Sequence, residues 1–149
     1  MANICIIPAR GGSKRIPRKN IKEFCGKPII SYSIKEAIYS KLFDKVIVST
    51  DDNEIEEVAR ENGASIPFRR PEKLSDDFTP IIPVIRHAIE CIENQGSQIE
   101  FVCCLFPTAP FVRKDDLKKA FDIFSYNVSD QVVISAAEYT YPIERSFLI

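Results

Sequence analysis

The sequence lacks an excess of charge of either sign. Its 149 residues include 20 lysines and arginines against 21 aspartates and glutamates, so the formal net charge is −1. A general nucleic-acid-binding protein needs a broad basic face, because much of its affinity comes from contacts with phosphates. The charge balance therefore argues against that function, and we expect no nucleic-acid partner.

Long apolar runs are also missing. No stretch is apolar over the roughly 20 residues that a membrane-spanning helix needs. The first residues do not combine a basic segment, an apolar segment and a cleavage site, so no signal peptide is predicted. We therefore expect a cytoplasmic protein without a membrane partner.

Cysteine occurs in an odd number and without metal-binding spacing. The five cysteines include no Cys-x-x-Cys pair, and Cys5, Cys103 and Cys104 lie in apolar, strand-like runs. In such runs a free cysteine packs as a small hydrophobic residue. This pattern argues against a zinc site or a disulfide framework and fits a reducing compartment. The single histidine, His87, has no paired acid or cysteine in the pattern and is interpreted as structural or solvated.

Strand-like and helix-like segments alternate along the chain. Apolar runs predict strands at residues 4–8, 43–49, 64–68, 100–106 and 131–137. Apolar residues at helical spacing predict a helix opening at Pro28, one capped by Asp51 or Asp52, one over residues 81–92 and one starting at Asp115 and Asp116. This alternation predicts an α/β fold of three layers, with a mostly parallel sheet between helices. Without a repeat or a linker, we expect one domain over residues 1–149.

A basic, glycine-containing loop follows the first expected strand. Six lysines and arginines fall between residues 10 and 22, together with Gly11 and Gly12. The loop matches neither the Walker A motif nor the Rossmann fingerprint. At the carboxyl end of a first strand, however, such a loop predicts a site for a nucleoside triphosphate. The two glycines would present backbone amides to phosphates, and Arg10 and Lys19 would neutralise a leaving pyrophosphate. The alternative is a solvated basic surface loop.

Four segments together resemble a known family. Residues 8–21, 26–29, 46–52 and 106–110 resemble the CMP-sugar synthetases that activate nonulosonic acids, among them the N-acylneuraminate and pseudaminic acid cytidylyltransferases. The resemblance covers essentially the whole chain. It implies the Rossmann-like nucleotide-diphospho-sugar transferase fold and a nucleotidyltransferase activity. In that reaction the anomeric hydroxyl of an acidic nine-carbon sugar attacks the α-phosphorus of CTP, and Mg²⁺ assists the departure of pyrophosphate.

The resemblance also implies roles for individual residues. Arg10 and Lys19 would be catalytic, Asn20 would contact the ribose or the base, and Arg70 matches an arginine of the cytidine site. Thr108 follows the carboxyl end of a strand, a position that faces the ligand in this fold class. The complete expected nucleotide site is Arg10, Gly11, Gly12, Ser13, Lys19, Asn20, Arg70, Asp77 and Thr108.

Two positions depart from the sialic-acid members of the family. Those members have glutamine where this chain has Phe106, and a small hydroxyl residue near Ile81. A phenyl ring cannot hydrogen-bond a sugar or a base, which argues against a sialic acid. Phe106 together with residues 76–79 and 141–145 resembles the pseudaminic acid branch of the family, so the resemblance favours pseudaminic acid as the acceptor. N-acylneuraminate stays the alternative, and 3-deoxy-manno-octulosonate is a third and weaker one.

The family places a metal-binding aspartate pair and a dimerisation element beyond the last residue of this chain. We therefore expect that part of the domain is missing, that no metal ligand is present, and that the longer form is a homodimer. The pairs Asp51–Asp52 and Asp76–Asp77 are interpreted as a helix cap and as a loop near the nucleotide. From a different functional class, the alternative is a truncated nucleotide-binding domain without catalysis.

Overall fold

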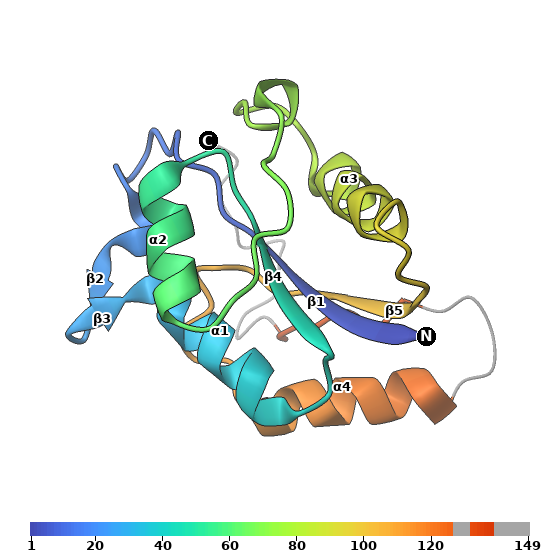
Figure 1. The fold of residues 1–149 in the computed structure, drawn as a ribbon. Coiled ribbons are helices and arrows are strands. Elements are labelled where there is room, and N and C mark those ends of the chain that lie inside the picture. Colours follow the sequence, from blue (N-terminus) through green and yellow to red (C-terminus); the bar gives the residue numbers. More distant parts are fainter. Residues whose placement is uncertain (127–131, 139–149) are drawn as a thin grey trace, which may run out of the picture. The chain divides into compact units, whose positions relative to one another are not determined.

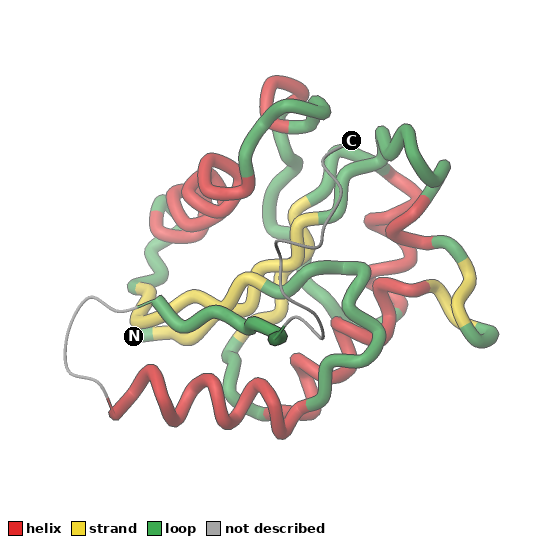
Figure 2. Tube along the Cα trace, turned by 180° about the vertical axis from the view of Figure 1, so that it is seen from behind, coloured by secondary structure: helices red, strands yellow, loops and turns green. Residues whose placement is uncertain are grey.

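A computed structural model describes residues 1–126 and 132–138, and the chain divides into the compact units Met1–Lys118 and Lys119–Ile149 (Figure 1). The first unit contains a parallel sheet in the order β4-β1-β5. Its strands are β1 (Ala2–Pro8), β4 (Lys45–Ser49) and β5 (Ile99–Cys104). Figure 2 shows the three strands side by side and the loops that leave their ends. The expected parallel sheet is thus confirmed.

The side chains of β1 alternate between two hydrophobic cores, as the pleat of a strand requires. Cys5 and Ile7 belong to a core with residues of α1 (Ile29–Ser40) and α2 (Asn53–Glu61). Ile4 and Ile6 belong to a second core with residues of α3 (Ile81–Glu93). Helices therefore cover both faces of the sheet (Figure 1), which confirms the expected three layers.

Pro28 precedes α1 instead of opening it. Its backbone is extended, with φ −55° and ψ 131°, and it pairs with Glu23 in a short hairpin. The hairpin consists of β2 (Glu23–Phe24) and β3 (Lys27–Pro28). The remaining elements are the 3₁₀ helices η1 (Lys19–Ile21) and η2 (Glu72–Leu74) and the helix α4 (Lys114–Tyr126). No helix within the described ranges is long and apolar enough to cross a membrane.

The prediction of a last strand at residues 131–137 is wrong for the part that is described. Residues 132–138 are irregular, while Gln131 lies outside the described residues. Val132 and Ile134 are 85% and 77% exposed. A segment with a strand-like pattern forms a strand only where a neighbour accepts its hydrogen bonds and covers its apolar face. Residues 64–68, also predicted as a strand, contribute one bridge, between Ser65 and Ile47 of β4.

Candidate functional site

A cleft of about 250 Å³ opens at the carboxyl ends of β1 and β5. β1 and β5 are neighbours in the sheet, but the chain that leaves β1 runs to β4, which is the neighbour on the other side of β1. The connections thus leave in opposite directions, and at such a switch point α/β sheets bind their ligands. The residues that line the cleft are Pro8, Arg10, Ser13, Lys19, Asn20, Arg70, Leu74, Asp76, Asp77, Thr79, Ile81, Val84, Phe106, Pro107 and Thr108.

Seven of the nine residues expected at the nucleotide line this cleft; Gly11 and Gly12 are not among its described lining residues. The Gly11 amide donates to Asp51 Oδ1 at 3.0 Å, so the protein itself engages the amide that we expected at a phosphate. Glycine is nevertheless required there, because a Cβ atom would lie 2.6 Å from Asp52 Oδ2. Nothing lies within 4 Å of a Cβ atom at Gly12.

Two cations of the basic loop converge on Asp77, which comes from the opposite side of the cleft. Lys14 Nζ lies 2.5 Å from Asp77 Oδ2, and Arg10 Nη2 donates to Asp77 Oδ1 at 2.5 Å. The hydrogen bonds from Lys14 and Arg10 hold the pKa of Asp77 below its ordinary value. Arg10 Nη1 also donates to the carbonyl oxygen of Ser75 at 3.4 Å. With Lys19 in the lining as well, this side of the cleft suits a polyanion.

Asn20 and Arg70 supply buried polar groups, with only 4% and 5% of each residue exposed. Asn20 Nδ2 donates to the carbonyl oxygen of Arg10 at 2.9 Å, while its buried Oδ1 has no partner among the described residues. Arg70 donates to the hydroxyl and the carbonyl oxygen of Ser49. Burial lowers the pKa of Arg70 to about 10, which still leaves it charged at neutral pH. A fixed cation and an unused acceptor are the polar groups that orient a ligand in a cleft.

The rest of the lining is mostly apolar. Ile81, Val84 and Phe106 contribute aliphatic and aromatic surface, and Phe106 is 56% exposed. The carbonyl oxygen of Phe106 accepts a hydrogen bond from Ser33 Oγ at 2.8 Å, which ties the end of β5 to α1. The cleft therefore combines a cationic part with an apolar part, as expected for a ligand that is charged at one end.

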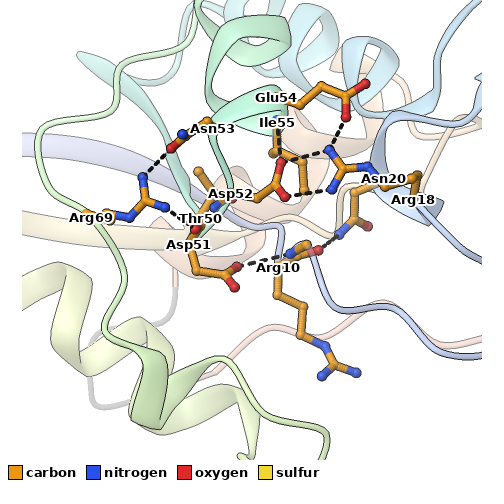
Figure 3. Close-up of polar contacts among 11 residues, drawn as sticks. Arg10, Arg18, Asn20, Thr50, Asp51, Asp52, Asn53, Glu54, Ile55 and Arg69 are labelled. Atoms are coloured by element: carbon orange, nitrogen blue, oxygen red, sulfur yellow. Dashed lines mark hydrogen bonds and ion pairs between the residues drawn. The ribbon is translucent and has the colours of Figure 1, made fainter.

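Arg18, counted among the basic residues of the loop, has a different role from Arg10. Its guanidinium donates to both carboxylate oxygens of Asp52, at 2.6 and 2.8 Å, and to Glu54 (Figure 3). Asp52 also accepts from the Ile55 amide at 3.0 Å, so the expected helix cap is confirmed and falls on Asp52. The Arg18 hydrogen bonds lower the pKa of Asp52 to about 2. No local sequence pattern pairs Arg18 with Asp52; the neighbouring positions of β1 and β4 in the sheet bring the basic and the acidic segment together.

The described residues do not fit a protein-bound Mg²⁺. Residues 1–126 and 132–138 contain no group of three or more metal-binding side chains in suitable positions. Asp76 Oδ1 accepts hydrogen bonds from the Phe78 and Thr79 amides and from the Thr79 hydroxyl. Asp77 is neutralised by Lys14 and Arg10. No described residue is therefore assigned to a metal.

His87 lies outside this cleft lining. Its Nε2 is 3.5 Å from the Cys91 sulfur, and its ring meets the Phe68 ring edge-on at 5.3 Å. The sequence pattern had suggested no cysteine partner, yet Cys91 lies four residues later on the same helix, where side chains meet. All five cysteines are free, as expected.

The structure defines an α/β protein with a cleft that is partly lined by cations, and the comparisons with known proteins place it more closely. A family model described as "Cytidylyltransferase" matches residues 4–144. The chain belongs to the cytidylyltransferase family.

Similar proteins carry names that specify an acceptor. The chain is 52% identical over 149 residues to a pseudaminic acid cytidylyltransferase of Campylobacter jejuni, matching 100% of this chain and 64% of that protein. It is 38% identical over 135 residues to an N-acylneuraminate cytidylyltransferase of Streptococcus agalactiae, which covers 89% of this chain and 32% of that protein. A solved structure of CMP:2-keto-3-deoxy-manno-octonic acid synthetase complexed with CTP has the same fold. Its TM-score is 0.70 at 21% identity, over 85% of this chain and 48% of that one.

Proposed function

We propose that this chain binds CTP in the cleft and transfers CMP to the anomeric hydroxyl of a nonulosonic acid, with pseudaminic acid as the preferred acceptor. The cleft itself carries the proposal, because cations and buried polar groups from separate segments meet at the carboxyl ends of β1 and β5. The 52% identity to a pseudaminic acid cytidylyltransferase, which extends along the whole chain, supports the choice of acceptor.

In the proposed reaction, the anomeric hydroxyl oxygen attacks the α-phosphorus of CTP. The bond from the α-phosphorus to the bridging oxygen breaks, pyrophosphate leaves, and the hydroxyl proton is released. Negative charge grows on the leaving group, and Arg10 and Lys19 are the cations proposed to stabilise it. Ser13 and Gly12 would help to hold the triphosphate. No covalent enzyme intermediate is required, so the chain acts by positioning and charge stabilisation.

The nucleoside end of CTP is proposed to contact Asn20, Arg70 and Thr108. Asn20 offers a buried amide oxygen that lacks a protein partner, and the base of CTP carries an amino group that can donate to it. Asp77 belongs to the proposed site because it lines the cleft and pairs with Arg10 and Lys14. Mg²⁺ is proposed to arrive with the triphosphate as its counter-ion.

An assay of pyrophosphate release tests this function. The chain is supplied with CTP, Mg²⁺ and either pseudaminic acid or N-acetylneuraminic acid at equal concentration. Faster release with pseudaminic acid supports the proposal, and faster release with N-acetylneuraminic acid supports the alternative acceptor. Binding of CTP without release in either case favours a nucleotide-binding domain that does not catalyse.

Three further expectations belong to the same proposal. We propose that residues 1–149 act as one nucleotide-binding domain, that the protein forms a homodimer, and that it works in the cytoplasm, where its five free cysteines stay reduced. Light scattering of the purified protein tests the second expectation, and fractionation of cells that produce the protein tests the third.

A further inference from the structure

The acidic turn Asp51–Asp52, which follows β4, holds the basic loop at two separate points. Asp51 Oδ1 accepts from the Gly11 amide at 3.0 Å near the start of the loop. The Asp52 carboxylate accepts two hydrogen bonds from Arg18 near its end. Figure 3 shows both contacts, with the Arg10 side chain directed away from them. The turn therefore fixes the loop by contacts that do not involve the Arg10 side chain, and Arg10 lines the cleft.

The backbone at Arg18 is in an unfavourable conformation. Its φ of 56° and ψ of 28° lie in the left-handed region, which residues other than glycine rarely adopt unless the surrounding structure holds them there. The next residues form η1 (Lys19–Ile21), and Lys19 and Asn20 of this turn line the cleft. The conformation of Arg18 thus decides the direction of the two residues that follow it.

We infer that Arg18 is a positioning residue for the nucleotide site, acting through Asp52 to set Lys19 and Asn20 in the cleft. The inference rests on the proposed function, because the ligand whose binding it affects is CTP. Arg18 is not among the described residues that line the cleft. Asp52 and Glu54 already neutralise its charge, so it contributes geometry to the site and not direct attraction to phosphates.

The sign of the Asp52 effect separates positioning from simple electrostatics. If charge alone mattered, Asp52→Asn would remove a negative charge near the polyanion and tighten CTP binding. If Arg18 works through Asp52, the same substitution weakens CTP binding, because asparagine cannot hold the guanidinium by two charged hydrogen bonds. Asparagine is as good a helix cap as aspartate, so α2 is preserved.

The experiment is a calorimetric CTP titration of the wild-type chain, Arg18→Ala, Asp52→Asn and the double variant, at a temperature where circular dichroism shows each to be folded. We expect each single variant to weaken CTP binding about tenfold, and the double variant to bind no more weakly than the weaker single. Arg18→Lys should recover only part of the loss, since one ammonium group cannot reproduce a paired contact.

Two control variants separate this effect from lost stability and from lost charge. Arg60→Ala breaks the exposed ion pair with Glu56 on the same helix α2, and it should leave CTP binding within about twofold of wild type. Arg15→Ala removes an exposed cation from the same loop, and it should also stay within about twofold.

The inference is overturned if Asp52→Asn binds CTP as tightly as wild type or more tightly, or if the losses in the double variant add. If Arg18→Ala does not fold, Arg18→Lys and Asp52→Asn decide between the same outcomes. A wild-type chain that binds no CTP overturns the proposed function and the inference together, whereas a CTP-binding wild type with unaffected variants overturns only the inference.

Discussion

Two of the three Asp-Asp pairs in the chain have opposite surroundings. Asp51 and Asp52 follow β4 and bind the backbone and Arg18 of the basic loop. Asp76 instead caps its own loop, and Asp77 meets Arg10 and Lys14 in the cleft. The first pair fixes the scaffold of the site, whereas the second faces the space that a ligand would enter. The same dipeptide thus acquires its role from the segment opposite it.

The difference follows from where each pair stands in the fold. β4 lies beside β1, so the turn after β4 and the loop after β1 meet directly at one edge of the sheet. The Asp76–Asp77 loop lies between η2 and α3, outside the sheet, and reaches the same basic loop from the far side of the cleft. A contact within the scaffold should therefore affect stability as well as the placement of the site, whereas a contact across the cleft should affect binding alone.

The largest expected effect is on CTP binding and comes from a residue that lines the cleft. Arg10→Ala removes the cation that we propose to hydrogen-bond a phosphate, and it should weaken CTP binding between about 10- and 100-fold. The melting temperature should hardly change, since Arg10 follows the end of β1 and its partners are at the cleft. Calorimetry and thermal denaturation measure the two quantities. Wild-type affinity in Arg10→Ala would remove the phosphate-loop assignment.

For the Asp51–Asp52 turn, which belongs to the scaffold of the site, we expect a substitution to lower stability. Asp52→Ala removes both the cap of α2 and the partner of Arg18, and it should lower the free energy of unfolding by about 1.5 kcal/mol. Urea denaturation followed by circular dichroism measures this change. Asp76→Ala is the matched control, because it removes a loop cap outside the sheet. An equal loss in both variants would contradict the distinction between the pairs.

The pH dependence of stability sharpens the same contrast. The pKa of Asp52 falls from its ordinary 3.8 to about 2 in the folded chain, so its charged form stabilises the fold. This contribution is complete above about pH 4 and is lost as the pH falls through about 2. Allowing for solvent screening, it amounts to about 1 kcal/mol. The difference in unfolding free energy between wild type and Asp52→Asn, measured from pH 5 to pH 2, should shrink by that amount. A constant difference contradicts the assignment.

The smallest effect is expected for Asp77→Asn. The substitution removes a carboxylate that competes with phosphates for Arg10 and Lys14, so CTP binding should tighten by about two- to threefold. The free energy of unfolding at neutral pH should be unchanged, because the ion pairs of Asp77 with Arg10 and Lys14 are exposed to solvent. Fluorescence or calorimetric titration detects a change of this size. Weaker binding would show that alignment of the two cations outweighs the competition.

The sequence predicts the layers of the fold well because they depend on local patterns. Ile4 to Ile7 read as a strand buried on both faces, and the structure divides them between two cores. The end of the chain behaves differently. Val132 and Ile134 have the pattern of a strand, but a strand also needs a neighbour, and no local pattern reports one.

Site residues could be predicted where a residue of suitable chemistry follows the end of a predicted strand. Arg10 and Lys19 lie in the loop that follows β1, and Thr108 lies in the loop that follows β5. All three residues line the cleft. The assignments of Gly11 and Arg18 could not be made from the sequence, because their partners lie about 40 and 34 positions away. Long-range pairing, and not residue chemistry, decided which parts of the basic loop face the cleft.

Calorimetric titration of the chain with CTP, GTP and ATP, each with Mg²⁺, measures whether the cleft selects a cytidine nucleotide. We expect CTP to bind more tightly than GTP or ATP, and Arg10→Ala to weaken the binding of CTP between about 10- and 100-fold. Equal binding of the three nucleotides, or binding of none, would contradict a cytidine site in this cleft.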